Sequence, residues 1–301
     1  MAHHHDRHAD GGGRRLLVVT VLNILITIAE VIGGIMANSL ALLSDAVHNL
    51  SDTIAILLAY IARRISGKAS NERKTFGYKR IEILAAFFNA LVLIGISAFL
   101  VLEAIKRFQD PEPIKGLLMF VVATAGLLFN LFAVILLRKH SGRNLNIRSA
   151  YLHLIGDTLS SFVVILGSVL IYFFSIYWID PLVTILISIY LIKEAWNIVK
   201  ETADILMQST PKGIDIPAIR KELEGIEGIS NIHHVHVWAL NDQDYHFECH
   251  ADLEADQHVS ATSSIREQME SLLSAKHGIG HVTVQFEFGA CDDKATIHNG
   301  N

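Results

Sequence analysis

The sequence is poor in cysteine and in charge. Cys249 and Cys291 are the two cysteines among 301 residues, too few for a disulfide framework, which suits a reducing cytosol. Charged residues make up 18% of the chain against 51% hydrophobic residues. The chain also lacks a His-Glu-x-x-His string, the pattern expected of a zinc protease with a general-base glutamate. These absences argue against a disulfide-stapled secreted domain and against an intramembrane metalloprotease.

The composition changes near residue 208. Up to that point the chain is apolar and carries 19 Lys+Arg against 15 Asp+Glu, whereas the rest carries 6 against 15. An acidic, polar second part argues against nucleic acid as a partner. We expect a disordered, histidine-containing tail over 1–13, a transmembrane domain over 14–208, a cytosolic domain over 209–290 and a tail over 291–301.

Six apolar runs, each near the ~20 residues that cross a bilayer, predict an α-helical membrane protein. They cover Leu16–Met36, Leu40–Ala62, Ile81–Ile105, Ile114–Leu137, Ala150–Phe174 and Leu182–Val199. Leaving out the tail 1–13, thirteen Lys and Arg lie before the first run and between runs 2–3 and 4–5, against three in the other connections. The positive-inside rule therefore places both termini in the cytoplasm.

Two histidines fall inside apolar runs, and both belong to His-x-x-x-Asp pairs. His48 and Asp52 lie in the second run, and His153 and Asp157 in the fifth. Residues four apart share one helix face, and ionisable groups at bilayer depth are costly unless paired or functional. Two histidines and two aspartates form a ligand set that tetrahedral zinc accepts. The spacing therefore predicts one intramembrane metal site built from two helices.

The polar second part predicts a small α+β domain in the order αββαβ. Helical patterns cover Ile214–Leu223 and Val259–Ala275, and strand patterns cover Asn231–Leu240, Tyr245–Leu253 and His281–Phe288. The segment 241–244, Asn-Asp-Gln-Asp, reads as a hairpin turn between the first two strands.

Three motifs resemble the cation diffusion facilitators, a family of zinc exporters. They are Leu43–Asp52, Phe76–Glu82 and His233–Trp238, and the resemblance extends over roughly Arg14 to Gly289. It implies a homodimer with a metallochaperone-like cytosolic domain, which moves zinc ions out of the cytosol in exchange for protons. The bacterial inner membrane is the expected location, and the lipid bilayer the expected surroundings.

The resemblance assigns the transport site to His48, Asp52, His153 and Asp157, with Asp45 in a structural role. It also implies a regulatory cytosolic zinc site at His233, His250 and Glu287, completed by His281 or Cys291. Arg80 and Asp204 resemble the family's charge pair, although they also suit ordinary helix ends. The segment Ser66–Thr75 contains neither Asp nor His, so the extra metal site of some members is not expected here.

The function predicted from these observations is Zn²⁺/H⁺ antiport, not an enzymatic reaction. Two imidazoles argue against Mg²⁺ and Mn²⁺, which favour oxygen ligands, but leave Cd²⁺, Co²⁺ and Ni²⁺ open as cargo. A metal-sensing membrane receptor is the alternative, although no recognisable catalytic or DNA-binding module follows the last run. The histidines at positions 3, 4, 5 and 8 suit either a weak metal scavenger or a tag remnant.

Overall fold

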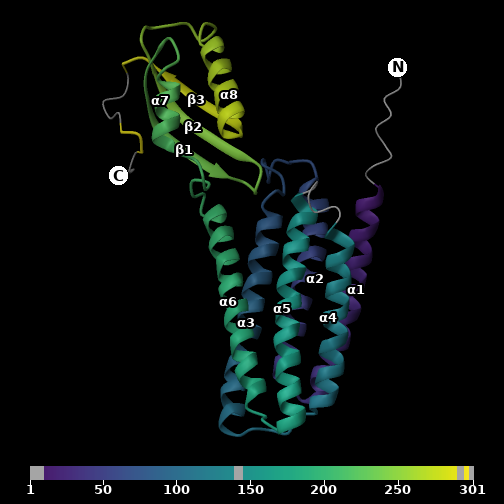
Figure 1. The fold of residues 1–301 in the computed structure, drawn as a ribbon. Helices are drawn as coiled ribbons and strands as arrows, with labels where there is room; N and C mark the ends of the chain where they lie inside the picture. The colour runs from purple at the N-terminus through teal and green to yellow at the C-terminus, as the bar shows by residue number, and fades with distance from the viewer. Residues whose placement is uncertain (1–9, 139–144, 290–294, 298–301) are drawn as a thin grey trace. The chain divides into compact units, whose positions relative to one another are not determined.

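The structure is a computed structural model that describes residues 10–138, 145–289 and 295–297. Figure 1 shows the course of the chain. The long helices are α1 (Asp10–Ala37), α2 (Leu40–Ser66), α3 (Ile81–Gln109), α4 (Gly116–Arg138), α5 (Leu145–Phe174) and α6 (Ile179–Leu206). All six are long and apolar enough to cross a membrane. The prediction of six spans is confirmed.

Several helix ends differ from the sequence prediction. Helix α1 (Asp10–Ala37) includes residues 10–13, which the sequence predicted as part of a disordered tail. Helix α6 begins at Ile179, ahead of Pro181, because proline is tolerated in the first turn, where its missing N–H would have no partner. The predicted runs leave a connection of residues 175–181 between the fifth and sixth helices, and this connection is therefore shorter in the structure. Helix α6 also continues past Val199 to Leu206.

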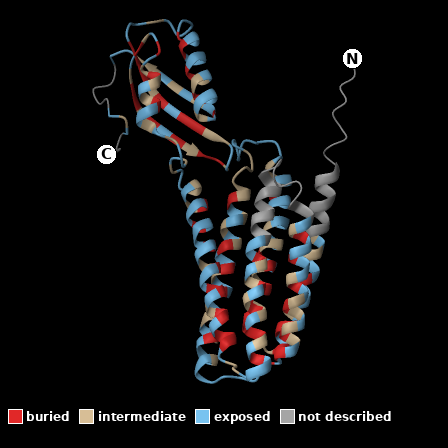
Figure 2. Cartoon of the chain, viewed as in Figure 1, coloured by how far each residue is buried: buried red, intermediate tan, exposed pale blue. Residues whose placement is uncertain are grey.

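The chain divides into two compact units. The first contains the residues up to Tyr60 together with Phe88–Val199, and the second contains Ile61–Phe87 together with Lys200–Asn301. In the first unit the helices lie side by side, with buried residues concentrated on their facing sides (Figure 2). Large apolar side chains such as Leu25, Phe99 and Phe132 point outward and are exposed, as a surface facing lipid requires.

Helix α4 packs against both α1 and α5. Gly126 of α4 allows a close approach to α1, because a Cβ atom built there would lie 2.6 Å from Glu30 Oε1. Small residues at such crossings are typical of helices packed within membranes.

A buried carboxylate joins the start of α2 to the start of α6. Asp180 Oδ1 accepts from Ser39 Oγ at 2.5 Å and from Ala41 N at 3.2 Å, and Asp180 Oδ2 accepts from Leu40 N at 2.8 Å. The first N–H groups of a helix have no partner within the helix, so an acceptor from another helix satisfies them. Asp180 thereby caps α2 from outside.

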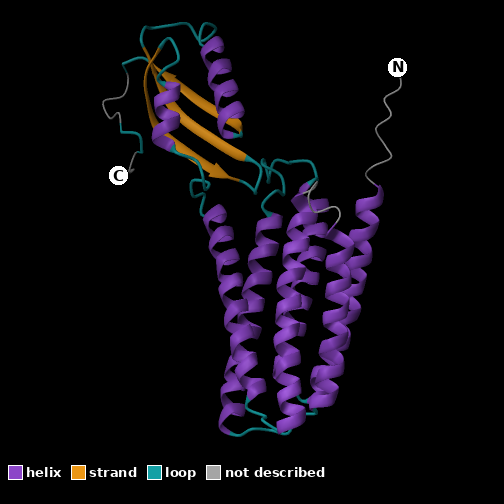
Figure 3. Ribbon diagram, viewed as in Figure 1, coloured by secondary structure: helices purple, strands orange, loops and turns teal. Residues whose placement is uncertain are grey.

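The second unit contains a three-stranded sheet with two helices (Figure 3). Its elements are α7 (Ile216–Leu223), β1 (Ile229–Ala239), β2 (Tyr245–Leu253), α8 (Ser263–His277) and β3 (Ile279–Glu287). The strand order is β1-β2-β3, with β1 antiparallel and β3 parallel to β2. The predicted αββαβ order is confirmed.

One hydrophobic core lies between the sheet and its helices. It joins Leu223 of α7, Met269 of α8 and Phe247 of β2 with the apolar residues around them. Because strand side chains alternate, His246, Glu248 and His250 lie on the opposite, helix-free face of the sheet.

The outer edge of β1 is covered by part of the C-terminal segment. His234 N donates to Ala295 O at 3.3 Å, and Val235 N donates to Thr296 O at 2.8 Å. Arg220 of α7 also donates to Thr296 Oγ1. Residues 295–297 therefore belong to the folded domain, beyond the boundary at 290 that the sequence predicted.

Candidate metal centres

The imidazole of His48 lies between two carboxylates inside the helical bundle. His48 Nδ1 is 3.5 Å from Asp52 Oδ2, one turn further along α2. His48 Nε2 is 3.1 Å from Asp157 Oδ1, on α5. Asp157 is buried, and His48 and Asp52 are partly buried. The structure thus brings together three of the four residues predicted for the transport site.

These three side chains suit one small cation. Each offers a ligand atom, and the three atoms lie within 4.8 Å of one another. Zinc–nitrogen and zinc–oxygen bonds of about 2.0–2.2 Å place neighbouring ligand atoms of a tetrahedral ion roughly 3.3–3.6 Å apart. The 3.1 Å between His48 Nε2 and Asp157 Oδ1 is close to that spacing. The 3.5 Å contact of Asp52 is made with the other ring nitrogen, Nδ1, so it is not a ligand–ligand distance around the same ion.

The fourth predicted ligand, His153, lies on α5 one turn before Asp157. Its side chain is outside the described residues. Residues four apart share a helix face, so the backbone is compatible with a position beside Asp157. The assignment of His153 stays a prediction.

Asp45 faces α5 through hydroxyl groups. Its Oδ1 accepts from Ser160 Oγ at 2.6 Å, and its Oδ2 accepts from Ser161 Oγ at 3.1 Å. Both carboxylate oxygens are therefore engaged in joining α2 to α5, three residues before His48. This contact supports the structural role expected for Asp45.

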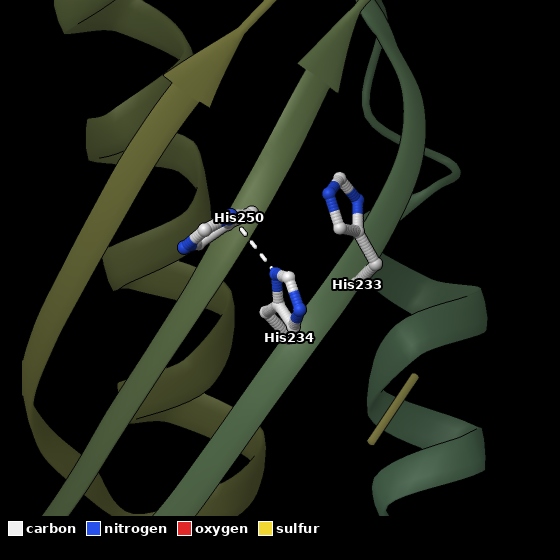
Figure 4. Close-up of side chains that lie close together, drawn as sticks. All are labelled: His233, His234 and His250. Carbon is white, nitrogen blue, oxygen red and sulfur yellow. Dashed lines mark hydrogen bonds between the residues drawn. The ribbon is translucent and has the colours of Figure 1, made fainter. Parts of the chain in front are cut away.

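A second cluster lies on the helix-free face of the sheet. His233, His234 and His250 each offer a nitrogen, all within 4.8 Å of one another (Figure 4). His234 Nδ1 and His250 Nδ1 are 3.2 Å apart. Glu287 completes the group from β3, with Oε1 2.9 Å from His250 Nδ1 and Oε2 3.5 Å from His233 Nε2. Three imidazoles and a carboxylate form another ligand set that zinc accepts.

His234 was missed by the sequence analysis because adjacent residues on a regular strand point to opposite faces. Here β1 contains a bulge, since His233 pairs with His250 but His236 pairs with Glu248, one residue more on β1 than on β2. His234 adopts φ 49°, the left-handed region. The bulge therefore brings two consecutive histidines into one cluster, and the His-His pair itself was the available signal.

His281, predicted as a completing ligand, lies elsewhere on the sheet. It pairs with His246 in the register of β2 and β3, and the two ring centroids are 4.5 Å apart. Six residues of strand, about 20 Å, separate His281 from Glu287. His281 is thus not part of the cluster, and His234 takes its place.

Cys249 does not add a ligand to the cluster. Cys249 points into the hydrophobic core, and burial raises the pKa of its thiol to about 12, which keeps it protonated. Cys291 and the N-terminal histidines at positions 3, 4, 5 and 8 lie outside the described residues.

The predicted charge pair does not form in this structure. The described ion pairs include none between Arg80 and Asp204, whereas the neighbouring Lys79 bonds Asp244 at 2.9 Å. That ion pair, reinforced by a hydrogen bond, holds the pKa of Asp244 below its ordinary value.

Two consecutive parts of the chain match known families of domains. Residues 16–207 match the cation efflux transmembrane domain, and residues 211–288 match the cytoplasmic domain of cation efflux proteins. Together these matches cover most of the chain, in the order that the structure shows.

Several relatives of known name are similar along almost their entire length. The "Cadmium, cobalt and zinc/H(+)-K(+) antiporter" of Bacillus subtilis is 41% identical over 290 residues, covering 95% of this chain and 92% of its own. The "Zinc transporter ZitB" of Pectobacterium atrosepticum is 39% identical, covering 100% and 94%. The "Metal cation efflux system protein CzcD" of Cupriavidus metallidurans is 36% identical, covering 99% and 94%.

The six membrane-spanning helices and these full-length similarities make the protein an integral membrane protein. The chain belongs to the cation efflux family, the cation diffusion facilitators.

Proposed function

We propose that this protein exports Zn²⁺ from the cytosol in exchange for H⁺, through a site formed by His48, Asp52, His153 and Asp157. The observation that carries the proposal is the imidazole of His48 held between two carboxylates from α2 and α5. Such a group inside a membrane bundle is costly unless it serves a function. The names of the relatives, which specify zinc transport and proton exchange, support the same direction.

Proton exchange follows from the chemistry of the ligands. Imidazole binds metal through a neutral nitrogen, and carboxylate binds it when ionised. When zinc leaves, the aspartates would remain charged in a medium of low dielectric constant. Protons on histidine or aspartate relieve that charge, so the empty site returns protonated and the next zinc ion displaces the protons.

The cargo is limited by the mixed nitrogen and oxygen ligands. Zinc, cadmium and cobalt all accept such a set, and these three metals appear in the name of the Bacillus subtilis relative. We propose zinc as the main cargo, with Cd²⁺, Co²⁺ and Ni²⁺ as secondary cargo.

We further propose that the protein acts as a homodimer in the bacterial inner membrane with both termini in the cytoplasm. The transmembrane part extends over about 14–208 and the cytosolic part over 209–297. The cluster of His233, His234, His250 and Glu287 would then bind cytosolic zinc and regulate transport.

The test is metal flux in proteoliposomes that contain the purified full chain, a zinc-sensitive dye and a pH dye. Wild type should move zinc with an opposite movement of protons, and an imposed proton gradient should accelerate it. Asp157→Ala should reduce zinc flux at least tenfold, because one of four ligands is lost. Asp110→Ala, which removes an exposed carboxylate beyond the end of α3, should transport normally.

Three results would contradict the proposal in different ways. Near wild-type flux in Asp157→Ala would exclude the assigned ligands. Zinc flux without any pH change would leave a transporter but exclude antiport. Zinc binding without flux would favour the metal-sensing receptor.

A further inference from the structure

A line of polar side chains crosses the interface between α1 and α2, next to the candidate transport site. We call it the polar seam, and it consists of Asn23, Thr27, Glu30, Asn49 and Thr53. Asn49 Nδ2 donates to Glu30 Oε2 at 2.8 Å, and Asn23 Nδ2 donates to Thr53 Oγ1 at 3.3 Å. Thr53 Oγ1 donates to Asn49 O at 3.0 Å, and Thr27 Oγ1 donates to Asn23 O at 2.8 Å.

Glu30 is the ionisable residue of this seam. Its exposed fraction is 1%, and Glu30 Oε2 accepts a hydrogen bond from the neutral amide of Asn49. Among the described residues, Glu30 Oε1 has no hydrogen-bond partner. An ionised carboxylate in that position would lack bulk solvent and a cation partner, which is strongly unfavourable inside a membrane.

A small cavity lies beside the carboxyl group of Glu30. Its volume is about 80 Å³, and its other walls are apolar residues of α1 and α4, among them Ile26, Val122, Gly126 and Phe129. A single water molecule needs roughly 10–15 Å³ of such volume. The carboxyl group can therefore meet a water molecule or exchange a proton without separating α1 from α2.

Among the described side chains, two acidic groups act on Glu30 through their charge. They are Asp45 of α2 and Asp157 of α5. Helix α4 has no charged residue before Arg138, and the apolar part of α1 has none besides Glu30. The ionised form of Glu30 is therefore opposed by its neighbours until a cation arrives nearby.

Helix α2 has the metal ligands and the seam on adjacent faces. Asn49 follows His48 directly, and Thr53 follows Asp52 directly. His48 faces α5 through Asp157, whereas Asn49 and Thr53 face α1 through Glu30 and Asn23. Helix α2 thus lies between Asp157 and Glu30 and contributes neighbouring residues to the metal site and to the seam.

We propose that Glu30 is an additional proton-binding group of the transport cycle, which releases its proton when a divalent cation binds on the other side of α2. The carboxylic acid loses H⁺ and becomes carboxylate as two positive charges enter the neighbouring site. It takes up H⁺ again when the cation leaves. Glu30 acts through the electric field and does not touch the metal.

The seam gives the proton a polar path toward the start of α1. Asn23 lies seven residues before Glu30, about 10 Å along the helix axis. This role rests on the proposed function, because without cation binding between α2 and α5 nothing would drive the change in protonation.

The test counts protons released per zinc bound by the full-length protein in detergent, with a pH indicator in weak buffer over pH 6–8. Glu30→Gln keeps an acceptor for Asn49 but does not titrate. It should bind zinc and release fewer protons than wild type, by up to one per site. Glu30→Asp, which titrates, should restore part of that loss.

Glu103→Gln is the matched control, since it removes a carboxylate of α3 that belongs neither to the seam nor to the metal site, and its proton count should equal that of wild type. Equal proton release in Glu30→Gln and wild type throughout pH 6–8 would overturn the proposal. This binding measurement is separate from flux, so wild type that moves no zinc would overturn the proposed function instead.

Infrared difference spectra decide the matter if Glu30→Gln does not fold. Zinc added to wild type should remove the C=O stretching band of a protonated carboxylic acid, and Glu30→Asp should shift the frequency of that band. Wild-type spectra without such a band, or a band that Glu30→Asp leaves unchanged, would overturn the role of Glu30.

Discussion

The carboxylate of Asp180 gives a prediction whose size follows from its contacts. In Asp180→Ala the N–H groups of Leu40 and Ala41 lose their acceptor, and all three residues are buried. Each buried N–H left without a partner costs about 1–3 kcal/mol. We therefore expect a loss of about 2–6 kcal/mol, before counting the bond from Ser39.

That loss corresponds to a fall in melting temperature of at least ~4 °C, taking about 2–4 °C per kcal/mol for a chain of this size class. The measurement is thermal unfolding of the purified full chain in detergent. Ser168→Ala is the control, because this buried hydroxyl donates to Ile165 O of its own helix. If Asp180→Ala melts within about 1 °C of Ser168→Ala, Asp180 does not hold the start of α2.

Two further predictions concern the cytosolic part of the chain. Zinc at a hundred times its Kd should stabilise an isolated 209–301 fragment, which has its own core, by about 2.7 kcal/mol, and His234→Ala should remove most of this gain; an equal gain in both would exclude His234 as a ligand. Burial, and then the charges of His281 and Lys79, lower the pKa of His246. The folded form therefore binds fewer protons than the unfolded chain, so His246 favours folding above a pH of about 6.5 and this stability is lost as the pH falls through its lower folded pKa. Denaturant unfolding at pH 5.5 and 7.5 should show this difference, and His246→Gln should reduce it; an unchanged difference would assign the pH dependence to other groups.

The large features of the fold follow from the sequence for physical reasons. A bilayer-spanning helix needs about 20 apolar residues, and six such runs separated by polar loops leave little choice. Helix ends are less predictable, as at Leu206, where α6 ends seven residues after the predicted Val199. A polar turn of helix outside the hydrocarbon shows no hydropathy signal.

The proximity of His48, Asp52 and Asp157 was predictable because the His-x-x-x-Asp spacing matches one helical turn. Glu30 was not proposed from the sequence, although one acidic residue within an otherwise apolar run was a usable signal. What the sequence does not contain is the neighbour of Glu30 across the interface, since pairing with Asn49 depends on how α1 packs on α2. For the cytosolic cluster, the assumption of a regular strand predicted that His234 faces away from His233, because a bulge leaves no clear signal in the sequence.

The bulge in β1 makes the cytosolic cluster depend on the length of the strand as well as on its residues. A regular β1, one residue shorter between His233 and His236, would turn His234 to the opposite face and return it to the helix-packed core. His250 would then lose its imidazole neighbour at 3.2 Å while every ligand type remained in the chain. Within this family, a deletion of Val235 alone would therefore remove His234 from the cluster, although every histidine of the cluster would still be in the chain.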